Sequence, residues 1–282
     1  MQEIKGKNVF VTGAASGIGR ATAIEFARSG VAMLLLNDIN RNGLQDTAAL
    51  IEKFGCKVIQ FPADISDFKA VKEMMEKALN EAGRIDILAN IAGTALISPL
   101  ENMEMDEWVK VLGIDLYGVL HTVHCLYPHM KKRGSGHIVN IASVAGLLAL
   151  HPYNAPYYVS KFGVVGFSEA LMLEGYPNGI NVTCICPGGV KTAIYDTSPI
   201  KGFTEEARTK TKSILLSAFC EEPEDKAKTI INAVLKNKFL VVTTTPAKII
   251  YFIKRHCSVI WYPLMRMLAR KFTKDFDQYR VS

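Results

Sequence analysis

The chain has 282 residues, of which 49% are hydrophobic and 21% charged, and a net charge of +6. This balance is typical of a globular protein and excludes a disordered chain. No apolar run approaches the ~20 residues that cross a bilayer, and the first residues show no signal segment, so we expect a cytoplasmic protein. The six cysteines form no CxxC pair, which favours a reducing compartment and no metal site.

Seven short apolar runs alternate with amphipathic segments along the chain. The runs occupy residues 8–12, 32–37, 57–61, 85–90, 136–143, 180–186 and 238–244. Continuous apolar runs are typical of strands buried on both faces, and strand–helix–strand alternation needs right-handed crossovers. We therefore predict an α/β fold over residues 1–245: a doubly wound, parallel, seven-stranded, Rossmann-like sheet with helices on both faces. Ligands of such sheets lie beyond the carboxyl ends of the strands.

A glycine-rich segment, VTGAASGIGR, follows the first predicted strand and opens a helix. Its glycines are Gly13, Gly17 and Gly19. Glycines let the backbone approach a pyrophosphate, whose charge is met by the free N–H groups of the helix start. The segment therefore predicts a nucleotide site.

Asp38 ends the second predicted strand, 19 positions beyond Gly19. A carboxylate there can accept hydrogen bonds from the adenosine ribose and repels a 2′-phosphate, which favours NAD over NADP. Asp38 as an ordinary strand-end turn residue is the alternative. Arg41 is the residue that could pair with a 2′-phosphate.

Two adjacent tyrosines stand in PYYVSK, residues 156–161. Tyr157 lies four positions before Lys161 and Tyr158 three, and residues four apart share a helix face. A neighbouring ammonium lowers the pKa of a phenol from about 10, as a proton-transferring tyrosine requires. Tyr157 is therefore the predicted acid/base. Ser143, after the fifth strand, is placed to hydrogen-bond a substrate oxygen.

The spacing Gly-x-x-x-Gly-x-Gly, the strand-end Ser143 and the Tyr-x-x-x-Lys pair, in this order, resemble the short-chain dehydrogenases/reductases over residues 1 to about 245. The resemblance implies an NAD(H)-dependent oxidoreductase that interconverts a secondary alcohol and a ketone. It implies the catalytic residues Ser143, Tyr157, Lys161 and Asp115. It also implies a cofactor site made of Gly13, Ser16, Gly17, Ile18, Gly19, Asp38, Asp64, Ile65, Asn90, Ala92, Gly93, Tyr157, Lys161, Pro187, Gly188, Val190 and Thr192.

Within that site the resemblance assigns the adenine side to Asp64 and Ile65, the ribose side to Asn90, Ala92 and Gly93, and the nicotinamide carboxamide to Val190 and Thr192. Ser16 occupies a loop position where NADP-dependent members often carry a basic residue.

Two positions depart from the family pattern. Ile91 replaces the second asparagine of an Asn-Asn-Ala-Gly element, and Asp115 stands where the family has an asparagine. The family asparagine is thought to act largely through its backbone carbonyl, so the resemblance implies that an aspartate can keep the proton relay. These departures leave a second hypothesis open, a non-catalytic dinucleotide-binding or redox-sensing protein.

Several other features carry weaker predictions. Residues 193–222 are expected to form a substrate lid, whose Ile, Leu, Phe and Tyr content favours an apolar ligand. Relative to the family spacing between Ser143 and Tyr157, the segment HPYNAP (residues 151–156) holds a small insertion. Tyr153 and Tyr158 then become candidates for the pocket wall or for core packing. His121 and His124 have helical spacing but no partners for a metal, so we expect packing. The resemblance implies a homodimer or homotetramer through helices near residues 105–132 and 157–175.

The C-terminal extension, residues 246–282, is apolar and basic. Residues 236–282 hold ten Lys/Arg against two Asp, a net +8 that leaves −2 for residues 1–235. We expect Pro263 to divide the extension into two short helices. Packing against the protein's own pocket or a neighbouring subunit and contact with a membrane surface are the two main alternatives. Nucleic-acid binding is the least favoured reading, and we expect no nucleic-acid partner. The apolar series is Ile249, Ile253, Cys257, Ile260, Leu264, Leu268 and Phe272.

Overall fold

The computed structural model describes residues 3–192, 194–206, 209 and 220–280, apart from the side chains of residues 195, 196, 258 and 277. Much of the predicted lid (193, 207–208 and 210–219) lies outside these residues, so the lid stays a prediction. The strands are β1 (Asn8–Thr12), β2 (Met33–Asp38), β3 (Lys57–Pro62), β4 (Ile87–Asn90), β5 (Gly136–Ile141), β6 (Ile180–Cys186) and β7 (Leu240–Val242). The helices of the main body are α1 (Gly17–Arg28), α2 (Arg41–Glu52), α3 (Phe68–Ala82), α4 (Met105–Leu112), α5 (Gly118–Arg133), α6 (Ala155–Gly175), α7 (Ile194–Thr197) and α9 (Pro223–Leu235).

These strands form one parallel sheet in the order β3-β2-β1-β4-β5-β6-β7, so the predicted doubly wound sheet is confirmed. The order reverses between β1 and β4, which are neighbours in the sheet. At this switch point the connections leave in opposite directions and open a crevice beyond the carboxyl ends of the strands. The residues that follow β1 and β4 therefore meet at one place.

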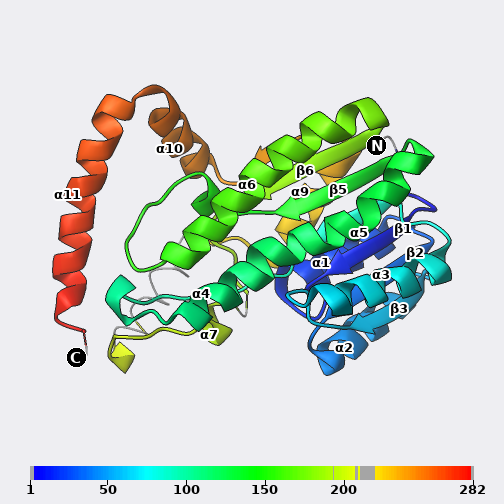
Figure 1. Ribbon diagram of the computed structural model, residues 1–282, viewed down its shortest axis with the longest axis horizontal. Helices are drawn as coiled ribbons and strands as arrows, with labels where there is room; N and C mark the ends of the chain where they lie inside the picture. Colours follow the sequence, from blue (N-terminus) through cyan, green and yellow to red (C-terminus); the bar gives the residue numbers. More distant parts are fainter. Residues whose placement is uncertain (1–2, 193, 207–208, 210–219, 281–282) are drawn as a thin grey trace.

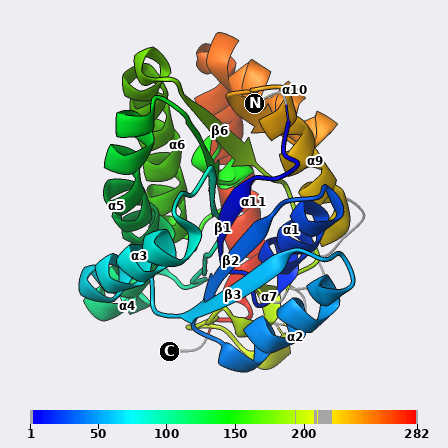
Figure 2. The same ribbon diagram turned by 90° about the vertical axis from the view of Figure 1, so that its right-hand side faces the viewer.

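Each face of the sheet is covered by a layer of helices, with α1, α2 and α9 on one face and α3, α5 and α6 on the other (Figures 1 and 2). The first layer buries Phe26, Leu44 and Ile230 against the sheet. The second layer buries residues such as Leu126 and Val164. Burial on both faces explains why the strands are continuously apolar instead of alternating.

Local signals set several of the helix starts. The Asp67 carboxylate caps α3 by accepting from the backbone N–H groups of Lys69 and Ala70, and Asn40 caps α2 in the same way. Such caps satisfy N–H groups that have no partner within the helix. The start of α1 differs, because its N-cap residue Ser16 makes no side-chain cap hydrogen bond.

The connection between β4 and β5 is a long helical segment, α4–α5, interrupted by a π-helical turn at Gly113–Tyr117. By length and composition, Met105–Arg133 is the one described helix that could cross a membrane. Its side chains Val119, Val123 and Leu126 pack in the sheet core, however, as in the core helix of an α/β protein. The π turn places Asp115 at the inner side of the segment, fully buried.

The extension forms two further helices, α10 (Thr245–His256) and α11 (Ser258–Asp277), at one end of the molecule (Figure 1). The prediction that Pro263 separates them is wrong: the break is at Cys257, and Pro263 lies inside α11. Pro263 stands only six positions into α11, so the backbone bond that it forfeits is close to the helix start.

Candidate active site

A cavity of about 580 Å³ lies at the carboxyl ends of the strands. Of the predicted catalytic and cofactor-binding residues, all but two line it. The exceptions are Asn90 and Asp115, which are buried behind its wall. Residues distant in the chain are thus gathered where the switch point predicts a ligand.

The glycine-rich loop passes very close to its neighbours. Gly13 has φ +69°, and a Cβ on it would lie 2.7 Å from the Ala92 backbone; one on Gly19 would lie 1.9 Å from the Gly13 carbonyl oxygen. No other residue type fits without moving the loop. Because Ser16 leaves the first N–H groups of α1 uncapped, these groups remain available to an anion at the cavity. The loop therefore fits the pyrophosphate of a dinucleotide.

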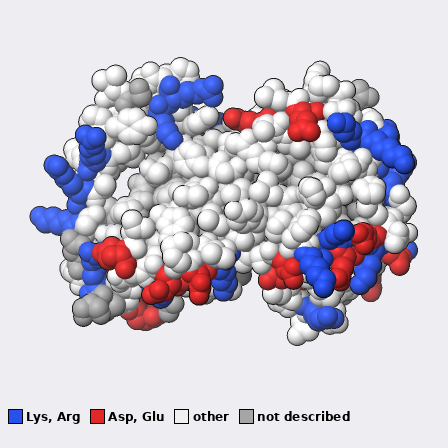
Figure 3. Space-filling model, viewed as in Figure 1, with Lys and Arg blue, Asp and Glu red and all other residues white. Residues whose placement is uncertain are grey.

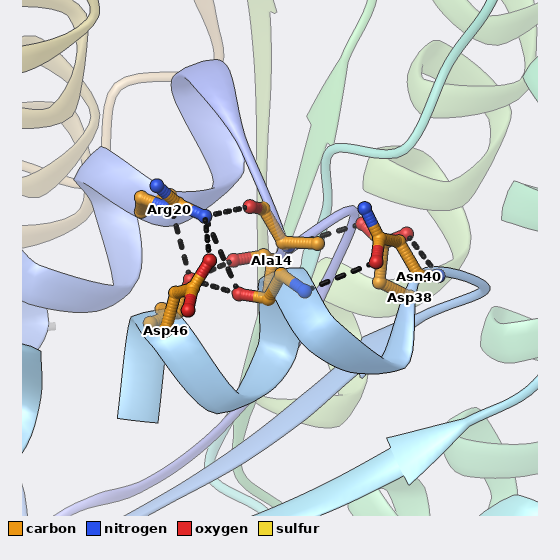
Figure 4. Close-up of polar contacts among 8 residues, drawn as sticks. Ala14, Arg20, Asp38, Asn40 and Asp46 are labelled. Carbon is orange, nitrogen blue, oxygen red and sulfur yellow. Dashed lines mark hydrogen bonds and ion pairs between the residues drawn. The ribbon is translucent and has the colours of Figure 1, made fainter. Parts of the chain in front are cut away.

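Asp38 lies at the other side of this loop (Figure 4). One carboxylate oxygen accepts from the backbone N–H of Ala15 at 3.0 Å, and the other from that of Asn40 at 3.0 Å. Asp38 thus holds the loop, as the strand-end alternative has it, and it also lines the cavity, where its ribose-binding role stays a prediction. Arg41 is exposed and does not line the cavity.

Arg20 is a supporting residue that the sequence analysis did not identify. Its guanidinium donates to the Ala15 carbonyl at 2.5 Å and to the Thr47 hydroxyl at 3.0 Å, and it lies 3.8 Å from the Asp46 carboxylate (Figure 4). These contacts tie the loop to α2. Arg20 directly follows Gly19 in the motif, but only the fold reveals its partners.

The loops after β3 and β4 also border the cavity. Asp64 accepts from both the backbone N–H and the hydroxyl of Ser66, at 2.8 and 2.7 Å. The Asn90 side chain donates to Asn140 at 3.0 Å and accepts from Thr122 at 2.7 Å, so it holds the strands together behind the cavity.

The Thr12 hydroxyl at the end of β1 joins the first glycine-rich loop to the loop after β4. It accepts from the backbone N–H groups of Ile91 and Ala92 at 2.9 and 3.2 Å. The backbone of this loop therefore stays bound to the end of β1 although Ile91 replaces the asparagine of the family pattern. His121 packs as predicted, with a ring nitrogen 2.9 Å from the Ile65 carbonyl oxygen and the ring against Phe68.

Tyr157 is half-buried in the wall of the cavity, where its hydroxyl contacts Ser143. Burial raises the pKa of the Tyr157 phenol above its usual range, and the Asp115 carboxylate raises it further; a hydrogen bond with the Ser143 hydroxyl acts in the opposite direction. The Lys161 ammonium lies 5.5 Å from the Tyr157 ring centre. The sequence predicts a lowered pKa, whereas burial in the structure favours the neutral phenol, which can donate a proton.

Lys161 pairs directly with Asp115, with 3.3 Å between Nζ and the nearer carboxylate oxygen. Asp115 also accepts from the Thr94 backbone N–H at 2.7 Å and from the Ser160 hydroxyl at 3.2 Å. Burial raises the pKa of Asp115, and the Lys161 charge opposes that rise. The side chain at this departure from the family pattern is therefore engaged with Lys161.

Tyr158 has a different task from Tyr157. Its hydroxyl accepts from the backbone N–H groups of Leu150 and His151 at 3.2 and 3.3 Å, so it fixes the segment between Ser143 and Tyr157. Tyr153, with φ +74°, packs its ring against Phe203 and Phe272. Both tyrosines thus serve packing and loop geometry among the described residues.

The loop after β6 is held by a half-buried ion pair that no sequence motif indicates. Lys226 of α9 is 1% exposed and contacts the Glu221 carboxylate, which also accepts from the Thr243 hydroxyl at 3.3 Å. The backbone of Glu221 pairs with residues 189–191, next to the predicted nicotinamide contacts. No local motif marks Lys226, because its position looks like any polar helix position.

Further cavity-lining residues come from segments without a motif. They include Asn37, Ile39, Lys110, Ile114, Ile194 and Thr197. Lys110 and Ile114 belong to the helical segment around the π turn, where helical periodicity alone does not indicate which side faces a ligand.

Comparisons with known proteins agree with this geometry. The family model for short chain dehydrogenases matches residues 7–200. The chain is 35% identical to 17-beta-hydroxysteroid dehydrogenase 13 of Mus musculus over 243 residues, covering 85% of this chain and 74% of that protein. It is 33% identical to D-beta-hydroxybutyrate dehydrogenase of Rhizobium meliloti over 210 residues, covering 71% and 80%.

Among solved structures, a short chain dehydrogenase/reductase from Burkholderia phymatum in complex with NAD superposes with a TM-score of 0.84 at 28% identity, covering 92% of this chain and 96% of that one. The strand order, the glycine-rich loop and the Ser143, Tyr157 and Lys161 side chains at one cavity account for these matches. The chain belongs to the short-chain dehydrogenase/reductase family.

Proposed function

We propose that this protein is an NAD(H)-dependent oxidoreductase that interconverts a secondary alcohol and a ketone. The observation that carries the proposal is that Ser143, Tyr157 and Lys161 line the same cavity as the glycine-rich loop and Asp38. A bound nicotinamide supplies the hydride acceptor or donor. In oxidation, the alcohol gives up its hydroxyl proton to Tyr157 and its carbon-bound hydrogen as hydride, so that a ketone remains.

The roles of the side chains follow from their contacts. Tyr157 holds or accepts the proton at its phenol oxygen, and Ser143 orients the substrate oxygen through the hydroxyl that contacts Tyr157. The Lys161 ammonium stabilises the phenolate and reaches the cavity, where a ribose hydroxyl can share it with Asp115. Asp115 thereby sets how much of the Lys161 charge is available to Tyr157.

We infer a preference for NAD over NADP. The Asp38 carboxylate borders the cavity and would face a 2′-phosphate, while Arg41 does not line the cavity. The nearby guanidinium of Arg20 already donates to Ala15 and Thr47. The charge at this end of the cavity therefore disfavours a further phosphate.

We infer an apolar substrate. The apolar residues that line the cavity include Ala142, Val190 and Ile194. Such a lining contributes binding through burial of apolar surface and offers few partners to a charged substrate. The two named relatives act, by their names, on a hydroxysteroid and on a hydroxybutyrate, so the family resemblance alone does not choose between a large and a small alcohol.

We further propose a homodimer or homotetramer that works in the cytoplasm. Apolar side chains such as Val109 in α4 and Val159 and Leu173 in α6 are exposed, on the helices expected to meet a second subunit. All six cysteines lie in the described part of the chain and no disulfide joins them, which fits a reducing compartment. The C-terminal extension is the part that we propose to contact a membrane surface.

Turnover on a panel of alcohols and ketones of increasing apolar size tests the function, with NAD(H) and NADP(H) each supplied. We expect NAD(H)-dependent turnover that improves with apolar size. Tight NAD binding by calorimetry without turnover of any member of the panel would overturn the enzymatic proposal and favour the non-catalytic alternative.

A further inference from the structure

The C-terminal helix α11 has two different apolar faces. Trp261, Met265 and Phe276 are spaced along one face and pack into the body of the protein, with Trp261 and Phe276 4% and 5% exposed. Ile260, Leu264, Met267 and Leu268 are spaced along another face and are between 37% (Leu264) and 64% (Ile260) exposed. We call these four residues the outer stripe.

The outer stripe is not needed to hold the extension in place. Trp261 and Met265 of α11, together with Ile250 and Tyr251 of α10, pack against the main core. The apolar series singled out in the sequence is therefore mostly solvent-facing, and neighbouring positions do the packing. Apolar side chains that folding leaves exposed along one helix face indicate a surface that binds something.

The extension presents this stripe on a fixed support. At the base of the extension, the Lys254 ammonium donates to the Leu147 carbonyl at 2.5 Å. Near its end, the Phe272 ring stacks on His151 at 6.0 Å between ring centres, and Phe276 meets Phe203 edge-on at 6.2 Å. Because α11 is attached near both ends, its outer stripe keeps a defined orientation.

Basic residues border the outer stripe on one side, toward the end of α11, where Asp275 is also exposed. Lys271 lies one helical turn beyond Met267, and Arg270 and Lys274 flank it on the same side of the helix. Figure 3 shows Lys and Arg side chains projecting from the edge of the molecule where α11 stands. An apolar stripe bordered by long basic side chains is the pattern of a helix that lies in a lipid headgroup region, since lysine can extend its ammonium to the phosphates.

A second copy of this chain fits the stripe less well than a lipid does. In a two-fold dimer the same patch meets itself, so the basic side chains beside the stripe would face each other. An anionic bilayer instead attracts the +8 segment. We propose that the outer stripe of α11 docks onto the surface of an anionic phospholipid bilayer, with Arg270, Lys271 and Lys274 at the headgroups.

Vesicle flotation of the full chain tests this proposal without reference to turnover. The probe is a vesicle of phosphatidylcholine with about one third phosphatidylglycerol, compared with pure phosphatidylcholine, at low salt and at about 0.5 M salt. We expect co-flotation with the anionic vesicles at low salt, and at least tenfold less with neutral vesicles or at high salt.

Two sets of variants locate the contact. Ile260→Glu with Met267→Glu should reduce the bound fraction at least tenfold, and Lys271→Gln with Lys274→Gln at least threefold. Leu50→Glu, which alters an exposed apolar residue of α2, is the matched control and should bind as the unchanged protein does. Thermal unfolding checks that the variants are folded; the substituted side chains are exposed, so stability should change little.

Equal absence of the unchanged protein from anionic and neutral vesicles would overturn the proposal. So would loss of an oligomer in sedimentation by the Ile260→Glu, Met267→Glu protein, since the stripe would then be a contact between copies. Because NAD-dependent turnover of a water-soluble alcohol is measured separately, failure of lipid docking and failure of the proposed reaction are distinguishable.

Discussion

The buried Lys161 ammonium lies 3.3 Å from the buried Asp115 carboxylate. An asparagine at this position would offer Lys161 a dipole, whereas Asp115 offers a full negative charge. The same carboxylate raises the pKa of Tyr157. One substitution relative to the family pattern thus acts on both residues of the Tyr-x-x-x-Lys pair.

Asp115→Asn should move the pH dependence of alcohol oxidation to lower pH. Oxidation requires the Tyr157 phenolate, and removing the carboxylate removes a charge that disfavours it, so the pKa of Tyr157 falls. We expect the rising limb of kcat/KM to shift down by roughly one pH unit. Ser160→Ala, which keeps the charge, should leave the limb nearly in place. A limb that stays put or moves up in Asp115→Asn contradicts the role assigned to this carboxylate.

Tyr157→Phe should lower kcat/KM about a thousandfold or more while NAD affinity changes by less than a few fold, because only the proton-transferring oxygen is lost. Tyr158→Phe removes the acceptor of two backbone N–H groups and should cost about 1 kcal/mol of unfolding free energy with little effect on the chemical step. Single-turnover kinetics and urea unfolding measure the two effects. Greater damage to the chemical step from Tyr158→Phe would refute the assignment.

Asp38 should set the choice of cofactor. We expect the unchanged protein to prefer NAD(H) at least tenfold in kcat/KM, equivalent to about 1.4 kcal/mol. Asp38→Asn removes the repelling charge while leaving a side-chain acceptor, so the preference should fall. Arg41→Ala is the control and should leave the ratio unchanged, because Arg41 does not line the cavity. Equal efficiency with both cofactors before any substitution would disprove the prediction.

Lys226→Met should destabilise the protein by about 1 kcal/mol, because it removes the partner of the Glu221 carboxylate, which is 36% exposed and can still be hydrated. The KM for NAD should rise, since the Glu221 backbone braces residues 189–191 beside the cavity. Adding Glu221→Gln should recover part of the stability by removing the unpaired charge. Urea unfolding and steady-state kinetics provide the readouts, and an unaltered KM would remove Lys226 from the support of the site.

The protein should sediment as a dimer or tetramer at micromolar concentration. Leu173 on α6 is 70% exposed, and Leu173→Glu should shift the equilibrium toward monomer by placing a charge in an apolar contact. Leu50→Glu should not. A monomer before substitution would contradict the prediction.

The sequence by itself determined the fold and the centre of the site. The strand–helix alternation identified the parallel sheet, because strands buried on both faces have to be apolar throughout. The glycine spacing, Asp38, Ser143 and the Tyr157–Lys161 pair could be located because each acts next to a strand end or within one helical turn. Such short-range geometry is fixed by backbone periodicity.

The tertiary structure decided every feature that depends on partners far away in the chain. Arg20 donates to Thr47, and Asp115 pairs with Lys161. Lys226 pairs with Glu221, whose backbone bonds to the loop at Val190. The orientation of the C-terminal helices also depends on the tertiary structure. The apolar series from Ile249 to Leu268 could have packed against the body, but in the structure it is mostly exposed and Trp261 is buried instead. Which side chain of an amphipathic helix faces the body depends on the surface that it meets, and that surface exists only once the chain has folded.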